Sequence, residues 1–170
     1  MSSEAIPAGS LAIRPAVPDD ARGIARVFLE SAEHHARLDA ERYAVPDFNP
    51  VEARYSRPDR QHDSPDGEEV TFVADLGGDI AGFVDVRLDR PPDIMHRNLI
   101  YCHIVEIAVS SACRGQGIGA RLLRTAEEWG STRGAEFASL EYNAANTRAA
   151  SFYTDRMGYR VAAHTAIKRL

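Results

Sequence analysis

Hydrophobic positions in this chain recur at two spacings, which alternate along its length. Apolar runs and strict alternation are typical of strands, and apolar positions three and four residues apart are typical of helices. Strand-like runs cover residues 11–16, 70–75, 80–88, 99–109, 135–142 and 159–170, the last as a strand or a tight hairpin. Helical spacing covers residues 18–38, 49–55, 118–130 and 146–157. The order predicts a sheet with helices on its faces.

Capping and turn residues mark several of these boundaries. Asn49-Pro50 predicts an N-cap followed by proline at the first helical position. Gly77-Gly78 predicts a hairpin turn, because glycine accepts the positive φ that such turns need. Gly158 suits the left-handed residue that ends the last helix. The polar segments 57–69 and 90–98 are expected to be loops.

Length and composition indicate one ordinary globular domain over residues 1–170. The chain is 44% hydrophobic and 26% charged, which excludes disordered, collagen-like and coiled-coil proteins. We expect no membrane span, because no apolar run approaches about 20 residues. The first ten residues lack the pattern of a secretory signal. Cys102 and Cys113 predict neither a disulfide framework nor a zinc site, so a reducing cytoplasm is the expected location.

Charge is distributed unevenly along the chain. The net charge of -5 argues against a nucleic-acid binder. Residues 1–95 hold 10 Arg and 19 acidic residues, whereas residues 96–170 hold 9 Arg, one Lys and 6 acidic residues. An acidic first part and a basic second part suggest two surfaces for two kinds of partner, and a chance distribution of solvated charge remains the alternative.

A glycine-rich segment lies between the most apolar strand and a clear helix. It reads Arg114-Gly-Gln-Gly-Ile-Gly119, and such a loop lets backbone N–H groups approach a ligand closely. The following helix adds its positive dipole end, so the segment predicts an anion site suited to a pyrophosphate. A P-loop would end in Gly-Lys-Ser/Thr, and no lysine is present here.

The same segment also fits a permissive dinucleotide-binding fingerprint. Gly115, Gly117 and Ala120 have the required spacing, and Glu141 falls where a ribose-binding acid would lie. Position counts against this alternative, because that fingerprint normally opens a series of βαβ units and only 50 residues follow Ala120.

The segment and its surroundings resemble the GNAT superfamily of acyl-CoA-dependent N-acyltransferases. The family's donor loop reads Arg/Gln-x-x-Gly-x-Gly/Ala, which Arg114, Gly117 and Gly119 match. Further family signatures match the strand at 105–109, Asn146-x-x-Ala149-x-x-Phe152-Tyr153, Met157-Gly158-Tyr159, and the opening Ile13-Arg-Pro-Ala16 with Asp19-Asp20. The strong match covers residues 99–160, and the earlier part matches in layout only.

The resemblance implies an α/β fold with a mostly antiparallel central sheet. A parallel strand pair would splay apart at the cofactor site, with helices on both faces. It implies acetyl-CoA as the acyl donor, a primary amine on a small molecule or peptide as the acceptor, and direct transfer in a ternary complex. No metal is expected, because the two Cys and six His show no ligand spacing. The residues that it places around the donor are Ile107, Ala108, Val109, Arg114, Gly115, Gln116, Gly117, Ile118, Gly119, Ala120 and Asn146.

Two residues are candidates for proton transfer. Glu106 interrupts an apolar strand, where a carboxylate is costly unless it has a partner or a role, and its strand leads into the glycine loop. The resemblance implies that Glu106 is the base, acting directly or through water. It also implies that Tyr153 protonates the leaving sulfur. The alternatives are a structural or exposed strand carboxylate and an ordinary core aromatic.

Other residues near the motifs carry weaker expectations. Asn146 is a helix N-cap, a partner for the pantetheine arm, or both. Cys113 suggests a thioester intermediate, but the family transfers directly, so it is expected to be incidental. His34 and His35 fall where the family forms its acceptor pocket, although a solvated helix face explains them more simply.

Three alternative functions therefore stay open. The first is a transferase with another acyl donor or a hydroxyl acceptor. The second is a non-catalytic acyl-CoA sensor, and the third is a dinucleotide-dependent oxidoreductase. The sequence does not decide between a monomer and a homodimer formed through the terminal strands.

Overall fold

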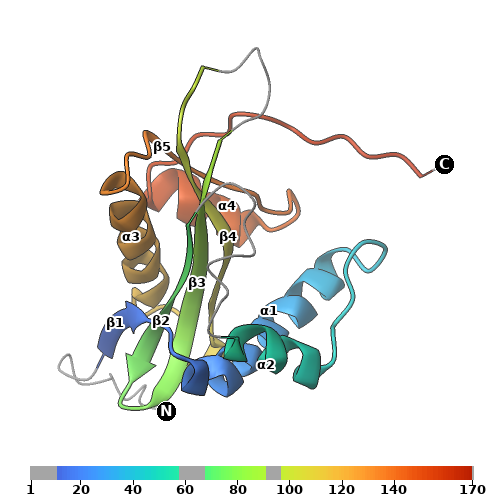
Figure 1. Cartoon of the computed structure of the whole chain (residues 1–170). Coiled ribbons are helices and arrows are strands. Elements are labelled where there is room, and N and C mark those ends of the chain that lie inside the picture. Colours follow the sequence, from blue (N-terminus) through green and yellow to red (C-terminus); the bar gives the residue numbers. More distant parts are fainter. Residues whose placement is uncertain (1–10, 58–67, 91–96, 170) are drawn as a thin grey trace.

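The structure is a computed structural model that describes residues 11–57, 68–90 and 97–169. Most of the predicted loops fall outside these ranges, at residues 58–67 and 91–96. One five-stranded sheet runs through the molecule and has helices on both sides (Figure 1). No helix in the described ranges is long and apolar enough to cross a membrane.

The sheet follows the chain in the order β1-β2-β3-β4-β5. Its strands are β1 (Leu11–Pro15), β2 (Glu69–Leu76), β3 (Asp79–Asp89), β4 (Tyr101–Val109) and β5 (Phe137–Leu140). The first three pairings are antiparallel, and β4 and β5 are parallel. The predicted turn between β2 and β3 is confirmed, with φ of 66° at Gly77 and 102° at Gly78. The predicted mixed sheet is therefore confirmed.

Helices cover the two faces of the sheet in sequence order. One face carries α1 (Ala21–Leu38) and α2 (Phe48–Ser56), and the other carries α3 (Ile118–Ser131), α4 (Thr147–Ser151) and a π-helical turn at Phe152–Arg156 (Figure 1). The side chains of α1 that follow helical spacing, such as Ile24 and Val27, are fully buried against Phe83 and Val73. The opposite face of β3 and β4 packs on Leu122 and Leu123 of α3 and on Tyr153.

A β-bulge in β4 changes which side chains face which layer. Asp85 pairs with Glu106 and the next residue of β3, Val86, pairs with Ile104, so Val105 has no partner in β3. Ile104 packs in the α3 layer, whereas Ala108 packs in the α1 layer. With strict alternation these two residues would share a face. The bulge therefore turns the second half of β4 over and brings Glu106 to the α1 side.

The parallel pair of β4 and β5 is short. Pairing begins at Tyr101 with Phe137 and ends at Ile104 with Leu140, although β4 continues to Val109. Residues 106–109 of β4 therefore pair with β3 on one side, and no described residue pairs with them on the β5 side. This opening is the splayed parallel pair that the resemblance implies.

Two predicted elements differ from the structure. The second helix begins at Phe48 with Asp47 as its N-cap, two residues before the predicted cap at Asn49. Pro50 is then the third helical residue. Its missing N–H costs nothing at this position, because the N–H groups of the first helical turn have no carbonyl partner within the helix. The predicted closing strand is wrong, since residues 159–169 contain no strand. Residues 160–169 are exposed and pair with no strand, which leaves them without the ladder and burial that would hold a strand.

Candidate active site

A cavity of about 510 Å³ opens at the splayed end of β4. Its walls are the second half of β4, the glycine loop, the start of α3, and α4 with the turn that follows it. Its lining includes Glu106, Tyr153 and every residue that the sequence predicted around the donor, except Gln116. Residues that are distant in the chain thus meet around one hollow, which is called the donor cavity below.

The glycine loop has the backbone shape that its sequence predicts. Gly115 and Gly117 have φ of 79° and 78°, a conformation that favours glycine, and nothing lies within 4 Å of where a Cβ would be. Gly117 is also the N-cap of the 14-residue helix α3. The open space beside both glycines and the unpaired N–H groups of the first helical turn form a cradle for an anion.

The loop is tied to the neighbouring elements by charged side chains. Arg114 donates from Nε to the carbonyl of Val109 at 3.1 Å. Glu30 of α1 accepts from the hydroxyl of Ser110 at 3.0 Å and from the backbone N–H of Ser111 at 2.6 Å. These bonds fix the segment between β4 and the glycines. Sequence reasoning considered Glu30 only as a group that could recognise a cationic acceptor, and it missed these bonds because the partners lie about 80 residues further along the chain.

Glu106 lies where two cavities meet. Its side chain is partly buried, and it lines both the donor cavity and a larger cavity of about 1570 Å³. The Ser31 hydroxyl of α1 donates to Glu106 Oε1 at 3.2 Å. Burial, with a smaller contribution from the charge of Asp85, raises the Glu106 pKa to about 7 against the opposing effects of Ser31 and Arg54. A carboxylate with that pKa exchanges protons near neutral pH.

Tyr153 is buried beside Glu106, with 8% of its side chain exposed. Its ring lies among those of Tyr142, Phe152 and Tyr159, at centroid distances of 5.6, 5.1 and 6.0 Å. Burial and then the charge of Glu106 raise its pKa to about 12. Its hydroxyl makes no hydrogen bond within the described ranges, although buried tyrosine hydroxyls usually have a partner. The hydroxyl is therefore a free proton donor in the wall of the donor cavity.

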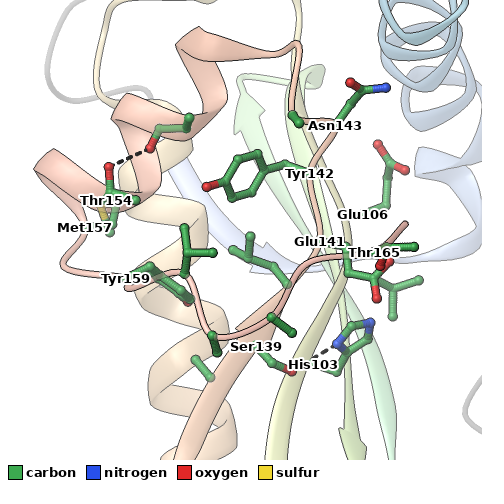
Figure 2. Close-up of a pocket in the computed structure, with 18 of the residues that line it drawn as sticks. His103, Glu106, Ser139, Glu141, Tyr142, Asn143, Thr154, Met157, Tyr159 and Thr165 are labelled. Carbon is green, nitrogen blue, oxygen red and sulfur yellow. Dashed lines mark hydrogen bonds between the residues drawn. The ribbon is translucent and has the colours of Figure 1, made fainter. Parts of the chain in front are cut away.

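The larger cavity lies between α1, β4, β5 and the C-terminal segment. Glu106, His103 and Glu141 are spaced along one wall of it in Figure 2. His103 Nδ1 is 3.0 Å from the Ser139 hydroxyl, and burial lowers the His103 pKa. This cavity meets the donor cavity at Glu106, and His35, which the resemblance places at an acceptor pocket, lines it. It is therefore labelled the acceptor cavity below.

The remaining predicted residues also lie near these cavities. Asn146 is an N-cap, since its Oδ1 accepts from the N–H of Ala149 at 3.1 Å, and its side chain also lines the donor cavity. His34 lines the donor cavity, and His35 lines both cavities. Burial lowers the His35 pKa. Cys113 lines the donor cavity and is partly buried.

The raised Glu106 pKa predicts a specific dependence of stability on pH. The folded protein holds a proton that an exposed glutamate, with an ordinary pKa of 4.5, releases well below pH 7. The free energy of unfolding should therefore fall as pH rises from about 4.5 to 7, by up to about 3 kcal/mol from this group. Urea unfolding at pH 5 and pH 8 measures the difference. The Glu106→Gln variant should lack this component, and Glu128→Gln, exposed on α3, should keep it.

Comparisons with known proteins identify the family of this chain. The chain matches the acetyltransferase (GNAT) family over residues 38–159. An uncharacterized N-acetyltransferase of Methanocaldococcus jannaschii is 33% identical over 90 residues, which are 52% of this chain and 51% of that protein. The match thus spans about half the length of that relative.

Solved structures with similar folds cover nearly the whole chain. A mutant form of the BH1408 protein from Bacillus halodurans has a TM-score of 0.81 at 20% identity, covering 94% of this chain and 99% of that one. AAC(6')-Iy, solved with a CoA-containing bisubstrate analogue, has a TM-score of 0.63 at 16% identity, covering 94% and 97%. At these identities the likeness concerns the fold alone. The family match itself covers most of the chain, and the protein belongs to the acetyltransferase (GNAT) family.

Proposed function

We propose that this protein is an N-acetyltransferase, in which residues 1–170 form one catalytic domain that moves an acetyl group from acetyl-CoA to a primary amine by direct attack. The observation that carries the proposal is the position of Glu106, a carboxyl with a pKa of about 7 at the junction of two cavities and beside the unpaired Tyr153 hydroxyl. One cavity would hold the donor and the other would admit the acceptor.

The residues of the donor cavity suit the chemistry of CoA. The glycine loop and the start of α3 offer backbone N–H groups to the pyrophosphate, and the Arg114, Arg148 and Arg156 side chains around the cavity supply positive charge. The unpaired edge of β4 at residues 105–109 offers backbone groups to the amides of the pantetheine arm. The CoA-containing analogue bound to AAC(6')-Iy, a protein of similar fold, supports the same class of donor.

Glu106 would act as the base. An alkyl ammonium has a pKa near 10.4, so an ordinary carboxylate accepts its proton at a cost of about six pKa units. The raised Glu106 pKa narrows that gap to roughly three units, while the group is still ionised in a large fraction of molecules at neutral pH. Glu106 takes one proton from the ammonium, either directly or through water, and the neutral nitrogen then attacks the thioester carbonyl.

Tyr153 would act as the acid. As the new C–N bond forms and the C–S bond breaks, the Tyr153 hydroxyl gives its proton to the leaving sulfur. The nitrogen loses a second proton as the amide forms, and this proton restores the phenol through solvent. Because the Tyr153 pKa is about 12, the hydroxyl carries its proton throughout the working pH range.

Donor binding tests the assignment of the cavity. Calorimetry should show saturable binding of acetyl-CoA at low salt. The affinity should fall as the salt concentration rises, because salt screens the attraction between the arginine side chains of the cavity and the diphosphate. NMR spectra of the amide groups should change at residues 114–120 and 105–109. NAD at the same concentration should neither bind nor displace acetyl-CoA. Binding of NAD at the loop would favour an oxidoreductase and overturn the proposal.

A further inference from the structure

Asp85 is a fully buried carboxyl in the middle of β3, with 0% of its side chain exposed. The Tyr55 hydroxyl of α2 donates to its Oδ2 at 2.9 Å, and the Thr71 hydroxyl of β2 donates to its Oδ1 at 2.6 Å. Burying a carboxylate costs folding free energy even when hydroxyl groups donate to it. A hydrophobic side chain at the same place on the sheet would avoid this desolvation cost. No step of the transfer described above uses Asp85, so its presence needs another explanation.

The strand register places Asp85 next to the proposed base. Thr71 pairs with Asp85 across β2 and β3, and Asp85 pairs with Glu106 across β3 and β4. Residues directly opposite in antiparallel strands have Cβ atoms about 4.5–5.5 Å apart on the same face. The bulge at Val105 is what turns Glu106 onto this face. Thr71, Asp85 and Glu106 therefore form one row of polar side chains across three strands.

The groups around Glu106 come from every element packed against it. Asp85 of β3 raises the Glu106 pKa, and Arg54 of α2 lowers it. Ser31 of α1 donates to its carboxylate, and His35 of the same helix lines both cavities with it. Glu141 lines both cavities after β5, and the Tyr153 pKa responds to the charge of Glu106.

We propose that Asp85 is a positioning residue that acts through Glu106: held by Tyr55 and Thr71 directly across the strand pair from Glu106, it sets how readily that carboxyl takes up a proton. This inference rests on the proposed role of Glu106 as the base. The hydrogen bonds to Tyr55 and Thr71 fix the Asp85 charge at one place and orientation, so its effect on the neighbouring carboxyl is constant. The row of Thr71, Asp85 and Glu106 across β2, β3 and β4 thereby brings the pKa of Glu106 closer to that of an ammonium substrate.

The test is a carbon-13 NMR titration of the Glu106 carboxyl, assigned by the signal that disappears in Glu106→Gln. In Asp85→Asn the Glu106 midpoint should move down by at least about half a pH unit, because a like charge close by is lost. Asp75→Asn removes a partly buried carboxylate of β2 that pairs with Arg14 of β1, and it should leave the midpoint in place. An unchanged midpoint in a folded Asp85→Asn protein would overturn the proposal.

A second variant keeps the test decisive if Asp85→Asn does not fold. The double variant Asp85→Leu with Tyr55→Phe removes the carboxylate and its buried donor together and leaves apolar side chains of similar shape, so the Glu106 midpoint should move down as in Asp85→Asn. A midpoint that stays or rises contradicts the proposal. The titration needs no turnover, so it remains informative if the protein fails to transfer acetyl groups. If transfer depends on Glu106 but the midpoint does not respond to Asp85, only this inference fails.

Discussion

The Glu106→Gln variant is expected to transfer acetyl groups at least about 100-fold more slowly than the wild type near neutral pH, because a positioned base contributes roughly 10²–10⁴-fold. Glutamine keeps the shape of the side chain and can still accept from the Ser31 hydroxyl, but it cannot take a proton from an ammonium. The loss should be largest at low pH and should shrink as pH rises, since a growing fraction of the amine is then neutral before it binds.

Steady-state rates of thiol release between pH 5.5 and 9.5 measure this effect. The wild-type kcat/KM should rise with pH and level off above a midpoint near the Glu106 pKa of about 7. The variant should show no inflection there and should keep rising with pH, because its rate follows the fraction of neutral amine. Glu128→Gln removes a carboxylate from the exposed side of α3 and should leave the profile unchanged. Equal rates for Glu106→Gln and wild type across this range would remove Glu106 from the mechanism.

The Tyr153→Phe variant should lower kcat by roughly 10²-fold and leave the affinity for acetyl-CoA nearly unchanged, because it removes a proton donor and keeps the ring. The ring makes the aromatic contacts with Tyr142 and Phe152, so folding should not suffer. The phenol has a pKa of about 12, so the loss should be the same at every working pH.

The control is Thr125→Val on α3, which removes a hydroxyl that donates to the Arg121 carbonyl at a position that lines neither cavity. It should transfer at the wild-type rate. Single-turnover measurements with saturating acetyl-CoA separate the chemical step from product release. A Tyr153→Phe protein with near-wild-type single-turnover rates would show that the thiolate leaves without an acid at this position.

The local parts of the fold and the donor side of the site could be predicted from the sequence. The glycines at 115 and 117, the Asn146 cap and the Gly77-Gly78 turn are signals carried by a few neighbouring residues, and backbone sterics alone determine what they do. Family resemblance added the proposed roles of Glu106 and Tyr153, which lie in the motifs that the chain matches.

The remaining features depend on contacts between distant segments. Strict alternation along β4 puts Glu106 on the same face as Ile104, and only the bulge at Val105 reverses this. Asp85 sits in a run of apolar strand residues, and its donors come from other elements of the fold. The C-terminal segment has strand-like composition, but no neighbouring strand supplies the hydrogen bonds that a strand requires.

The two cavities differ in charge, although not as the uneven charge along the chain suggests. Arg114, Arg148 and Arg156 of the second part line the donor cavity. The acidic side chains that line the acceptor cavity also come from the second part, and they are Glu106, Glu127, Glu136 and Glu141. A cationic amine and a polyanionic donor would thus approach from sides of opposite charge.

Direct transfer from acetyl-CoA to an amine is tested by thiol release in the presence and absence of acceptors, with mass spectrometry of both acceptor and protein. Small amines, polyamines, aminoglycosides and a lysine-containing peptide form the panel. The account predicts rapid release only with an amine, one acetylated amine per free CoA, and no acetyl group on Cys113 or elsewhere on the protein. Tight acetyl-CoA binding without release for any acceptor, or an acetylated protein formed before the acceptor is added, would contradict it.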